Sequence, residues 1–327
     1  MSEKIQVGGQ AVIEGVMMRT QGSLSVVIRK RNGEMKIKRE RLVSVVERMP
    51  FLGKPFFRGV VVLVEALIKG IQALMYSAQQ NMEDEAGEAA NSPDKAKDRW
   101  AMGIFVAIGA GVGILFFVVI PHVLTLIMGR VGNTDMGVET VRFHVVDGVL
   151  KLAFFILYIR TISLMKDIRR VFQYHGAEHK SIHAYEAGQP LTLEGAMPFP
   201  TIHPHCGTAF ILLVLTLSII VFSALFPMVP LFRTLGRYEI HLAIMVIKIL
   251  LFVPIAGISY EIIKLADRRP RNLILQALTR PGLWLQSMTT REPTAEQLEV
   301  ALTALKSTLE MEQNRCDLPF REGKDVR

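Results

Sequence analysis

Long apolar runs dominate the pattern of hydrophobic and polar positions between residues 100 and 267. Each run approaches the roughly twenty residues that an α-helix needs to cross the hydrocarbon core of a bilayer. Four runs meet this length, at residues 102–120, 145–164, 208–226 and 242–260. They predict a membrane domain with four helical spans, in which a polar loop at residues 165–207 joins the second span to the third.

The four runs differ in how clearly they indicate a span. Residues 102–120 and 208–226 contain no charged residue. Pro121 is expected to end the first span, because proline cannot donate a backbone hydrogen bond inside a helix. Lys151 and Arg160 interrupt the second run, although long side chains near the ends of a span can reach the head groups. The second run is therefore the weakest candidate.

Shorter patterns at the start of the chain predict a small β-rich unit over residues 1–54. Three stretches are apolar or alternating and β-prone: residues 10–18, 24–31 and 34–40. Asn32-Gly33 lies between the last two and favours a two-residue hairpin turn. Apolar and basic residues alternate after this turn, so one face of the hairpin is expected to contact water.

Helical periodicity marks two further segments. Apolar residues repeat at helical spacing over residues 56–80, in a helix that could lie in the membrane interface or pack on the protein itself. With the acidic linker behind it, this helix forms a second unit, residues 55–99. The basic segment 268–327 is expected to contain a final helix that starts at a capping box, Thr294 with Gln297. The pattern as a whole predicts a mainly α fold: a multi-pass helical membrane bundle with a small N-terminal β-hairpin unit and cytoplasmic helices.

The composition agrees with a membrane protein. Of 327 residues, 50% are hydrophobic, and the mean hydropathy is +0.32. The net charge is +8, and residues 1–60 carry twelve Lys and Arg against five Asp and Glu. Such a bias suits anionic lipid head groups. No nucleic-acid-binding motif is present, so the expected partners are the lipid bilayer and a substrate that the sequence does not identify.

The distribution of Lys and Arg predicts an orientation. The loop at 165–207 carries four and residues 261–292 carry six, whereas the loops at 121–147 and 227–240 carry two each. By the positive-inside rule, both termini and the 165–207 loop are predicted to be cytoplasmic. The two cysteines, 110 positions apart, do not indicate a disulfide framework and suit a reducing compartment.

The most distinctive chemistry lies in residues 173–208, which hold five of the eight histidines and one of the two cysteines. His175 and His179 stand four positions apart, so a helix places both on one face. His-x-x-Glu-His is the inverted form of a zinc-hydrolase motif, in which two histidines bind the metal and the glutamate, here Glu178, acts as general base.

A third ligand must come from elsewhere, and His203 and Cys206 are well placed after the loop. These residue types favour a divalent metal ion, zinc above all. Three protein ligands with an open position would form a catalytic site, and four would form a structural one. Cys206 could instead be a nucleophile with a histidine base.

Other polar residues are expected to surround this site without binding the metal: Tyr174, His183, His205 and Glu14. Lys248 is a lone charge inside the fourth span and needs a partner there, for which Glu65 and Glu261 are candidates, unless its side chain snorkels. Three histidines are expected near the outer ends of the spans, separately or as a second metal site: His122, His144 and His241.

Five motifs resemble those of the YqhQ family: GGQAVIEGVMM (8–18), YHGAEHK (174–180), HP-x-CGT (203–208), PGLWLQ (281–286) and TTREP (289–293). The resemblance runs from residue 8 to about residue 302. It implies a bacterial multi-pass protein of the plasma (inner) membrane, described as a predicted metal-dependent enzyme. The motif residues that it carries over are His175, Glu178, His179, His203 and Cys206, with Glu14. The family usually has Arg at position 205, which argues against His205 as an essential ligand, and His183 lies outside the motif.

Two hypotheses follow. In the first, the chain is a metal-dependent membrane enzyme that hydrolyses an unidentified substrate at the cytoplasmic face. His175 and His179 hold the ion with His203 or Cys206, and Glu178 is the base. In the second, the chain is a non-catalytic metal-binding membrane protein, a transporter component or a partner-binding module, whose metal holds the loop between spans two and three.

Overall fold

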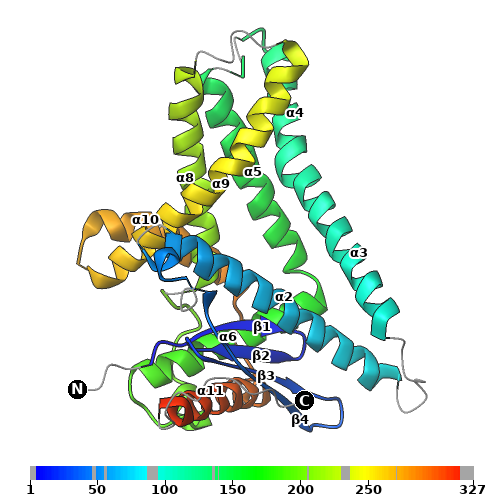
Figure 1. Ribbon diagram of the computed structural model, residues 1–327, viewed down its shortest axis with the longest axis vertical. Coiled ribbons are helices and arrows are strands. Elements are labelled where there is room, and N and C mark those ends of the chain that lie inside the picture. Colours follow the sequence, from blue (N-terminus) through cyan, green and yellow to red (C-terminus); the bar gives the residue numbers. More distant parts are fainter. Residues whose placement is uncertain are drawn as a thin grey trace.

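The computed structural model describes residues 5–45, 49–54, 57–86, 95–134, 137–138, 140–204, 206–229, 236–269 and 271–316. Long helices rise from a base that contains a four-stranded antiparallel sheet (Figure 1). The helices greatly outnumber the strands, and the sheet lies near the N-terminus of the chain. The predicted fold class is therefore confirmed.

The elements follow one another along the chain as two groups. The strands are β1 (Gly8–Val12), β2 (Gly15–Arg19), β3 (Ser23–Arg29) and β4 (Met35–Arg41). The helical elements are η1 (Pro50–Gly53), α2 (Phe57–Ala86), α3 (Lys95–Ile114), η3 (Leu115–Val119), α4 (Ile120–Val131), α5 (Val141–Ile162), α6 (Lys166–Glu186), α7 (Leu193–Ala196), α8 (Gly207–Leu225), η4 (Phe226–Met228), α9 (Arg237–Arg268), α10 (Leu273–Thr289) and α11 (Ala295–Cys316).

The sheet has the strand order β1-β2-β3-β4, with every neighbouring pair antiparallel. A turn joins β3 to β4 at Asn32-Gly33 as predicted, and Gly33 has a φ of +86° there. Its loop has three residues (31–33) rather than two, because the N–H of Lys30 donates to the carbonyl of Glu34. The stretch predicted as one strand, residues 10–18, is instead a hairpin of β1 and β2. Glu14 turns the chain with a φ of +52°. Gly15 follows it because a Cβ at that position would lie 2.2 Å from the carbonyl oxygen of Val27.

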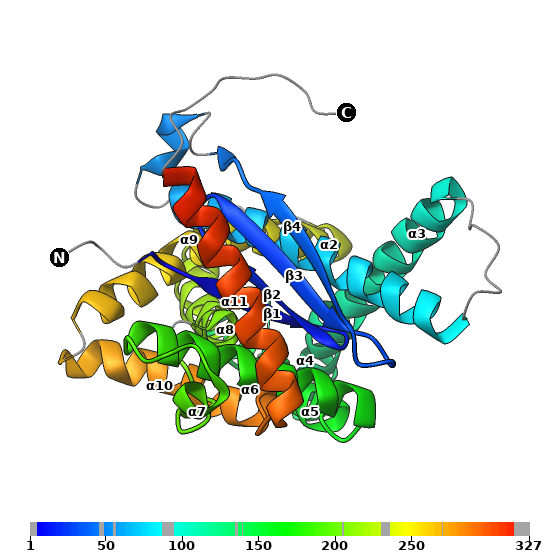
Figure 2. The same cartoon turned by 90° about the horizontal axis from the view of Figure 1, so that it is seen from below.

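Both faces of the sheet are covered. Helices α6 and α11 pack on one face (Figure 2), where they share a buried core with β2 and β3. That core includes Val16, Val27, Tyr174, Leu298 and Leu305. Helix α2 contributes Ala73 to the core on the other face. The first and last described segments of the chain are therefore parts of one folded unit.

The start of α11 confirms the predicted capping box. The backbone N–H of Thr294 donates to Gln297 Oε1 at 2.9 Å, and the backbone N–H of Gln297 donates to Thr294 Oγ1 at 3.3 Å. These two bonds satisfy donors that the first turn of a helix otherwise leaves free. The cap fixes where the chain turns from the site segment into α11.

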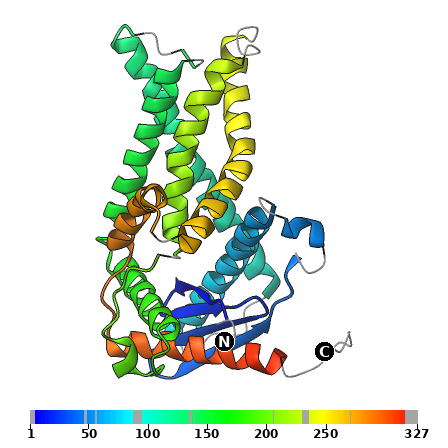
Figure 3. The same ribbon diagram turned by 90° about the vertical axis from the view of Figure 1, so that its left-hand side faces the viewer.

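Four helices of the described chain are long and apolar enough to cross a membrane: Phe57–Glu85, Ala107–Val131, Ala209–Met228 and Glu239–Ala266. The last three overlap the first, third and fourth predicted spans. The first is α2, which runs across the lower end of the bundle rather than parallel to its helices (Figure 1). Helix α5 covers the predicted second span; it is not among the four, yet it lies alongside α4 and α8 in the bundle (Figure 3).

The prediction that Pro121 ends the first span is wrong. The helix continues through Pro121 to Val131, with a π-helical turn at Leu115–Val119 immediately before it. A π turn shifts the hydrogen-bond pattern by one residue, which allows a proline without an N–H to stand in a continuing helix. The candidate span accordingly extends to Val131.

A buried carboxylate on α5 is the partner of Lys248. Asp147 is 2% exposed, and its Oδ2 accepts hydrogen bonds from Lys248 at 2.6 Å and from Lys151 at 2.7 Å. The two predicted partners of Lys248, Glu65 and Glu261, bind other residues. The ion pair of Asp147 with Lys248 joins α5 to α9. It explains how a helix with several charges can lie inside an apolar bundle.

The three histidines of the bundle divide into two groups. His122 Nε2 lies 3.2 Å from His241 Nδ1, so these two rings form a pair between α4 and α9. His144 instead stacks on Phe226, with ring centroids 4.7 Å apart. The structure therefore separates His144 from the other two.

Candidate metal centre

The sequence places the histidine pair on α6, whose opposite side is buried against the sheet and α11. Tyr174 and Ala177 belong to that buried core. A close backbone contact fixes the helix from another side, because a Cβ at Gly176 would lie 2.0 Å from the carbonyl oxygen of Arg291. The N–H of Arg291 donates to the carbonyl of Phe172 at 2.9 Å. The chain that follows α10 therefore lies directly on α6 beside the histidines.

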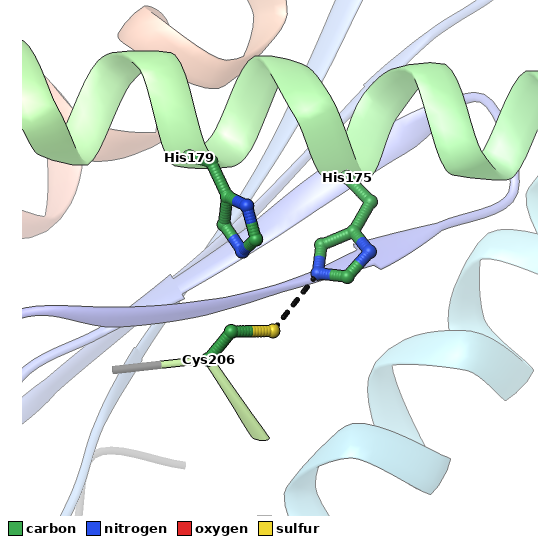
Figure 4. Close-up of side chains that lie close together, drawn as sticks. All are labelled: His175, His179 and Cys206. Carbon is green, nitrogen blue, oxygen red and sulfur yellow. Dashed lines mark hydrogen bonds between the residues drawn. The ribbon is translucent and has the colours of Figure 1, made fainter. Parts of the chain in front are cut away.

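Three of the predicted ligands come together (Figure 4). His175 and His179 project from α6 towards Cys206, which directly precedes α8. One potential ligand atom from each of the three residues lies within 4.8 Å of the other two. His175 Nε2 is 3.2 Å from Cys206 Sγ, and the rings of His175 and His179 have centroids 4.4 Å apart.

Backbone carbonyls orient both imidazole rings. His175 Nδ1 donates to the carbonyl of Thr289 at 2.9 Å, and His179 Nδ1 donates to the carbonyl of Thr201 at 2.5 Å. A carbonyl only accepts, so the proton of each neutral ring stands on Nδ1, and Nε2 carries the lone pair that could bind a metal. Metal-binding histidines are usually held in this way.

One buried atom indicates that the three residues fit a metal. His179 is 1% exposed, and its Nε2 has no hydrogen-bond partner of good geometry in the described chain. Burial also lowers the pKa of His179, which keeps the ring neutral and able to act as a ligand. Two imidazoles and a thiol are ligands that zinc prefers.

Glu178 lies beside this cluster, on the side of α6 that faces β1. It packs against Gly9, where a Cβ would lie 2.7 Å from both Cγ and Oε1 of Glu178. Burial raises the pKa of Glu178 to about 7, and nearby His175 opposes this shift. The carboxyl group can therefore both bind and release a proton near neutral pH.

His203 lies next to the cluster but outside its set of three. Its ring centroid is 5.7 Å from that of His179 and 4.4 Å from that of His183. His203 Nε2 is 3.0 Å from Glu186 Oε2. Gln286 fixes its backbone, accepting from the N–H at 2.9 Å and donating to the carbonyl at 2.8 Å.

Sequence reasoning missed one residue of this region, Glu186. Glu186 stands three positions after His183 on α6, a spacing that could have drawn attention to it. His183, expected to be a neighbour only, lies with Glu186 and His203 in a second group whose ligand atoms are within 4.8 Å of one another. His205 lies outside the described residues.

Glu14 and Tyr174 are placed to hold α6 rather than to touch the ligands. Arg170 Nε donates to Glu14 Oε1 at 2.6 Å, and Tyr174 Oη donates to Glu14 Oε2 at 3.2 Å. Burial raises the pKa of Tyr174, so its hydroxyl stays protonated as the donor. The turn between β1 and β2 is thereby attached to the helix that carries the site.

Comparison with known proteins places this site inside a family. The sequence profile of the family described as "Protein of unknown function (DUF1385)" matches residues 54–311. The Bacillus subtilis (strain 168) protein named "Uncharacterized protein YqhQ" is 30% identical over 315 residues, which cover 93% of this chain and 92% of that protein. No solved structure matches the chain. Every residue of both ligand groups lies within the matched range.

Proposed function

The chain belongs to the DUF1385 family, and we propose that it is a metal-dependent hydrolase of the membrane surface. His175, His179 and Cys206 are the proposed ligands of a divalent ion, zinc or a similar metal. The observation that carries this proposal is the buried Nε2 of His179, which makes no hydrogen bond of good geometry within the described residues and stands beside two further ligand atoms. A buried lone pair without a partner is costly unless something binds it.

The proposed chemistry is hydrolysis with Glu178 as the base. A divalent ion in a site with three protein ligands supplies Lewis acidity towards water and the substrate. Glu178, with a pKa of about 7, can take a proton from water at its carboxylate and return it to the leaving group. Thr289 and Thr201 would keep the two imidazoles oriented throughout, because their carbonyls are backbone groups fixed by the fold.

The proposed location is the cytoplasmic face of a bacterial plasma membrane. The excess of Lys and Arg in residues 165–207 and 261–292 supports this orientation. We place α3 with α4, α5, α8 and α9 across the bilayer, and α2 along its surface. Exposed apolar side chains of α2, including Leu67 at 60% exposure, would then contact lipid.

A metal site without catalysis remains the second candidate, and one observation favours it. The proposed ligands lie on α6, in the lower part of the molecule, and at Cys206, directly before α8 of the bundle, so a metal there would connect the two parts. Such a site could serve a transporter component or a partner-binding module. Glu178 would then be a buried residue without a chemical role.

Metal content of the purified protein tests the site itself. The wild type should retain a divalent ion through gel filtration in detergent, and His175→Ala and Cys206→Ala should lose it. Cys316→Ser is the matched control for removal of a thiol and should retain the ion. Equal metal in all four proteins would refute the site.

Glu178→Gln distinguishes the two candidates. Glutamine preserves the shape of the side chain but cannot act as a base. If the variant keeps its metal and loses hydrolysis of chromogenic esters, phosphoesters or amides that the wild type cleaves, the site is catalytic. If it keeps both metal and cellular function, the site is structural.

A further inference from the structure

The third histidine of α6, like the two proposed ligands, donates one ring nitrogen to a backbone carbonyl. His183 Nε2 donates to the carbonyl of Ile202 at 2.9 Å. His175 and His179 also donate to backbone carbonyls, although through Nδ1 rather than Nε2, and the carbonyl that orients His179 belongs to Thr201, the residue before Ile202. Three histidines at intervals of four residues thus each have one nitrogen held by the backbone, which leaves the other nitrogen as a potential ligand.

The free nitrogen of His183 stands in a second set of ligands. His183, Glu186 and His203 each offer an atom within 4.8 Å of the others. Two imidazoles with one carboxylate form a three-ligand set that is known from catalytic zinc sites. Two imidazoles with one thiolate, as in the first set, likewise offer three ligands of the types that bind zinc. Each set also contains one group that carries a negative charge when it binds a cation.

The two sets are neighbours. The ring centroids of His179 and His203, one from each set, are 5.7 Å apart. The sets differ in exposure, because the side chain of Glu186 is 44% exposed whereas His179 is 1% exposed. The second set therefore has one exposed member, Glu186, whereas each set has one buried histidine.

An ion pair between His203 and Glu186 would also explain their distance of 3.0 Å. It would not explain His183, whose ring lies 4.4 Å from that of His203 and is held by Ile202 in the orientation of a ligand. A hydrogen bond from a neutral His203 ring to Glu186 would explain the same distance, but it too gives His183 no part in the contact. A cation between the three residues accounts for all of these features.

We propose that His183, Glu186 and His203 bind a second divalent ion next to the first, so that α6 and the segment before α8 form a two-ion centre. This inference rests on the proposed function, because it extends the same centre. It directs the search for a substrate towards phosphoesters and peptides, the classes that adjacent divalent ions commonly hydrolyse.

Metal stoichiometry with Co²⁺ as the probe tests the second site separately from the first. Purified full-length protein in detergent is stripped, dialysed against Co²⁺, and examined by elemental analysis and absorption spectroscopy. Only the first set contains a thiolate, so only that set produces a thiolate-to-cobalt charge-transfer band. The wild type should bind two equivalents and show the band.

Variants then assign each ion. His183→Ala with Glu186→Gln should bind one equivalent, half of the wild-type content, and keep the band. Cys206→Ala should lose the band. Glu310→Gln, which removes an exposed carboxylate of α11, is the matched control and should bind two. Circular dichroism and gel filtration confirm that each variant is folded.

The outcomes separate the two proposals. One equivalent in the wild type, lost with Cys206→Ala and unchanged by the His183 and Glu186 substitutions, overturns the second site and leaves the first intact. Loss of all metal in the double variant also overturns it, because the residues would then belong to one shared site. No bound metal in the wild type overturns both.

Discussion

Replacing Asp147 with asparagine should destabilise the bundle far more than replacing either lysine that it binds. Asparagine keeps the shape of the side chain but removes the negative charge. Two ammonium groups would then face one neutral amide. Lys151 is 17% exposed at its side chain and can turn away, whereas Lys248 is 5% exposed and has nowhere to move.

The magnitude follows from the surroundings of Lys248. Its Nζ lies 5.5–5.8 Å from the ring centroids of Phe143, Phe222 and Phe226, which can attract a cation but cannot neutralise it. Breaking a buried ion pair by removing one partner costs about 3–5 kcal/mol. At roughly 2–4 °C per kcal/mol for a large domain, the melting temperature should fall by about 10 °C.

A double variant provides the decisive comparison. Asp147→Asn with Lys248→Met removes both buried charges, and methionine suits the three phenylalanine rings, so most of the lost stability should return. Lys151→Met, which leaves the bond between Asp147 and Lys248 in place, is the control. Thermal unfolding in detergent, followed by circular dichroism, measures all four proteins. The reasoning is wrong if Asp147→Asn melts like the wild type, or if the double variant is no more stable than the single one.

Three further predictions concern the site and its orientation. Gly176→Ala should cost about 1–3 kcal/mol, measured by thermal unfolding, because its Cβ would meet the carbonyl of Arg291 at 2.0 Å; Gly109→Ala, in open space, should be neutral. A chelator should lower the melting temperature of the wild type but not of Cys206→Ala, since a ligand present at a thousandfold excess over its Kd stabilises by about 4 kcal/mol. Cysteines introduced at residues 185–195 should not react with an impermeant reagent added to intact cells; labelling from outside would contradict the cytoplasmic orientation.

Local patterns in the sequence were sufficient for much of this structure. The capping box at Thr294, the turn at Asn32-Gly33 and the helix that carries His175 and His179 each depend on residues only a few positions apart. The spacing of the two histidines needs nothing more than the period of a helix to bring them together. Apolar runs of sufficient length likewise indicated helices that can cross a membrane.

Contacts between distant segments were beyond such patterns. The carboxylate that neutralises Lys248 stands 101 positions away, on another helix. The groups that fix His203 belong to Gln286, 83 positions further along the chain. Pairings of this kind depend on how helices pack, and helical periodicity shows which face of a helix is apolar without showing what that face meets. The division of the proposed ligands into two sets depends on these same contacts.

The five motifs that resemble those of the YqhQ family meet around α6 and the segment before α8, although they span most of the chain. GGQAVIEG contributes Gly9, which lies against Glu178, and TTREP contributes the Thr289 carbonyl that orients His175. PGLWLQ contributes Gln286, which fixes His203. A segment that only stabilised the part of the molecule around the sheet could do so with apolar side chains alone. These segments instead supply a glycine, a carbonyl and an amide to the surroundings of the proposed ligands, which supports a shared task of holding those side chains in one geometry.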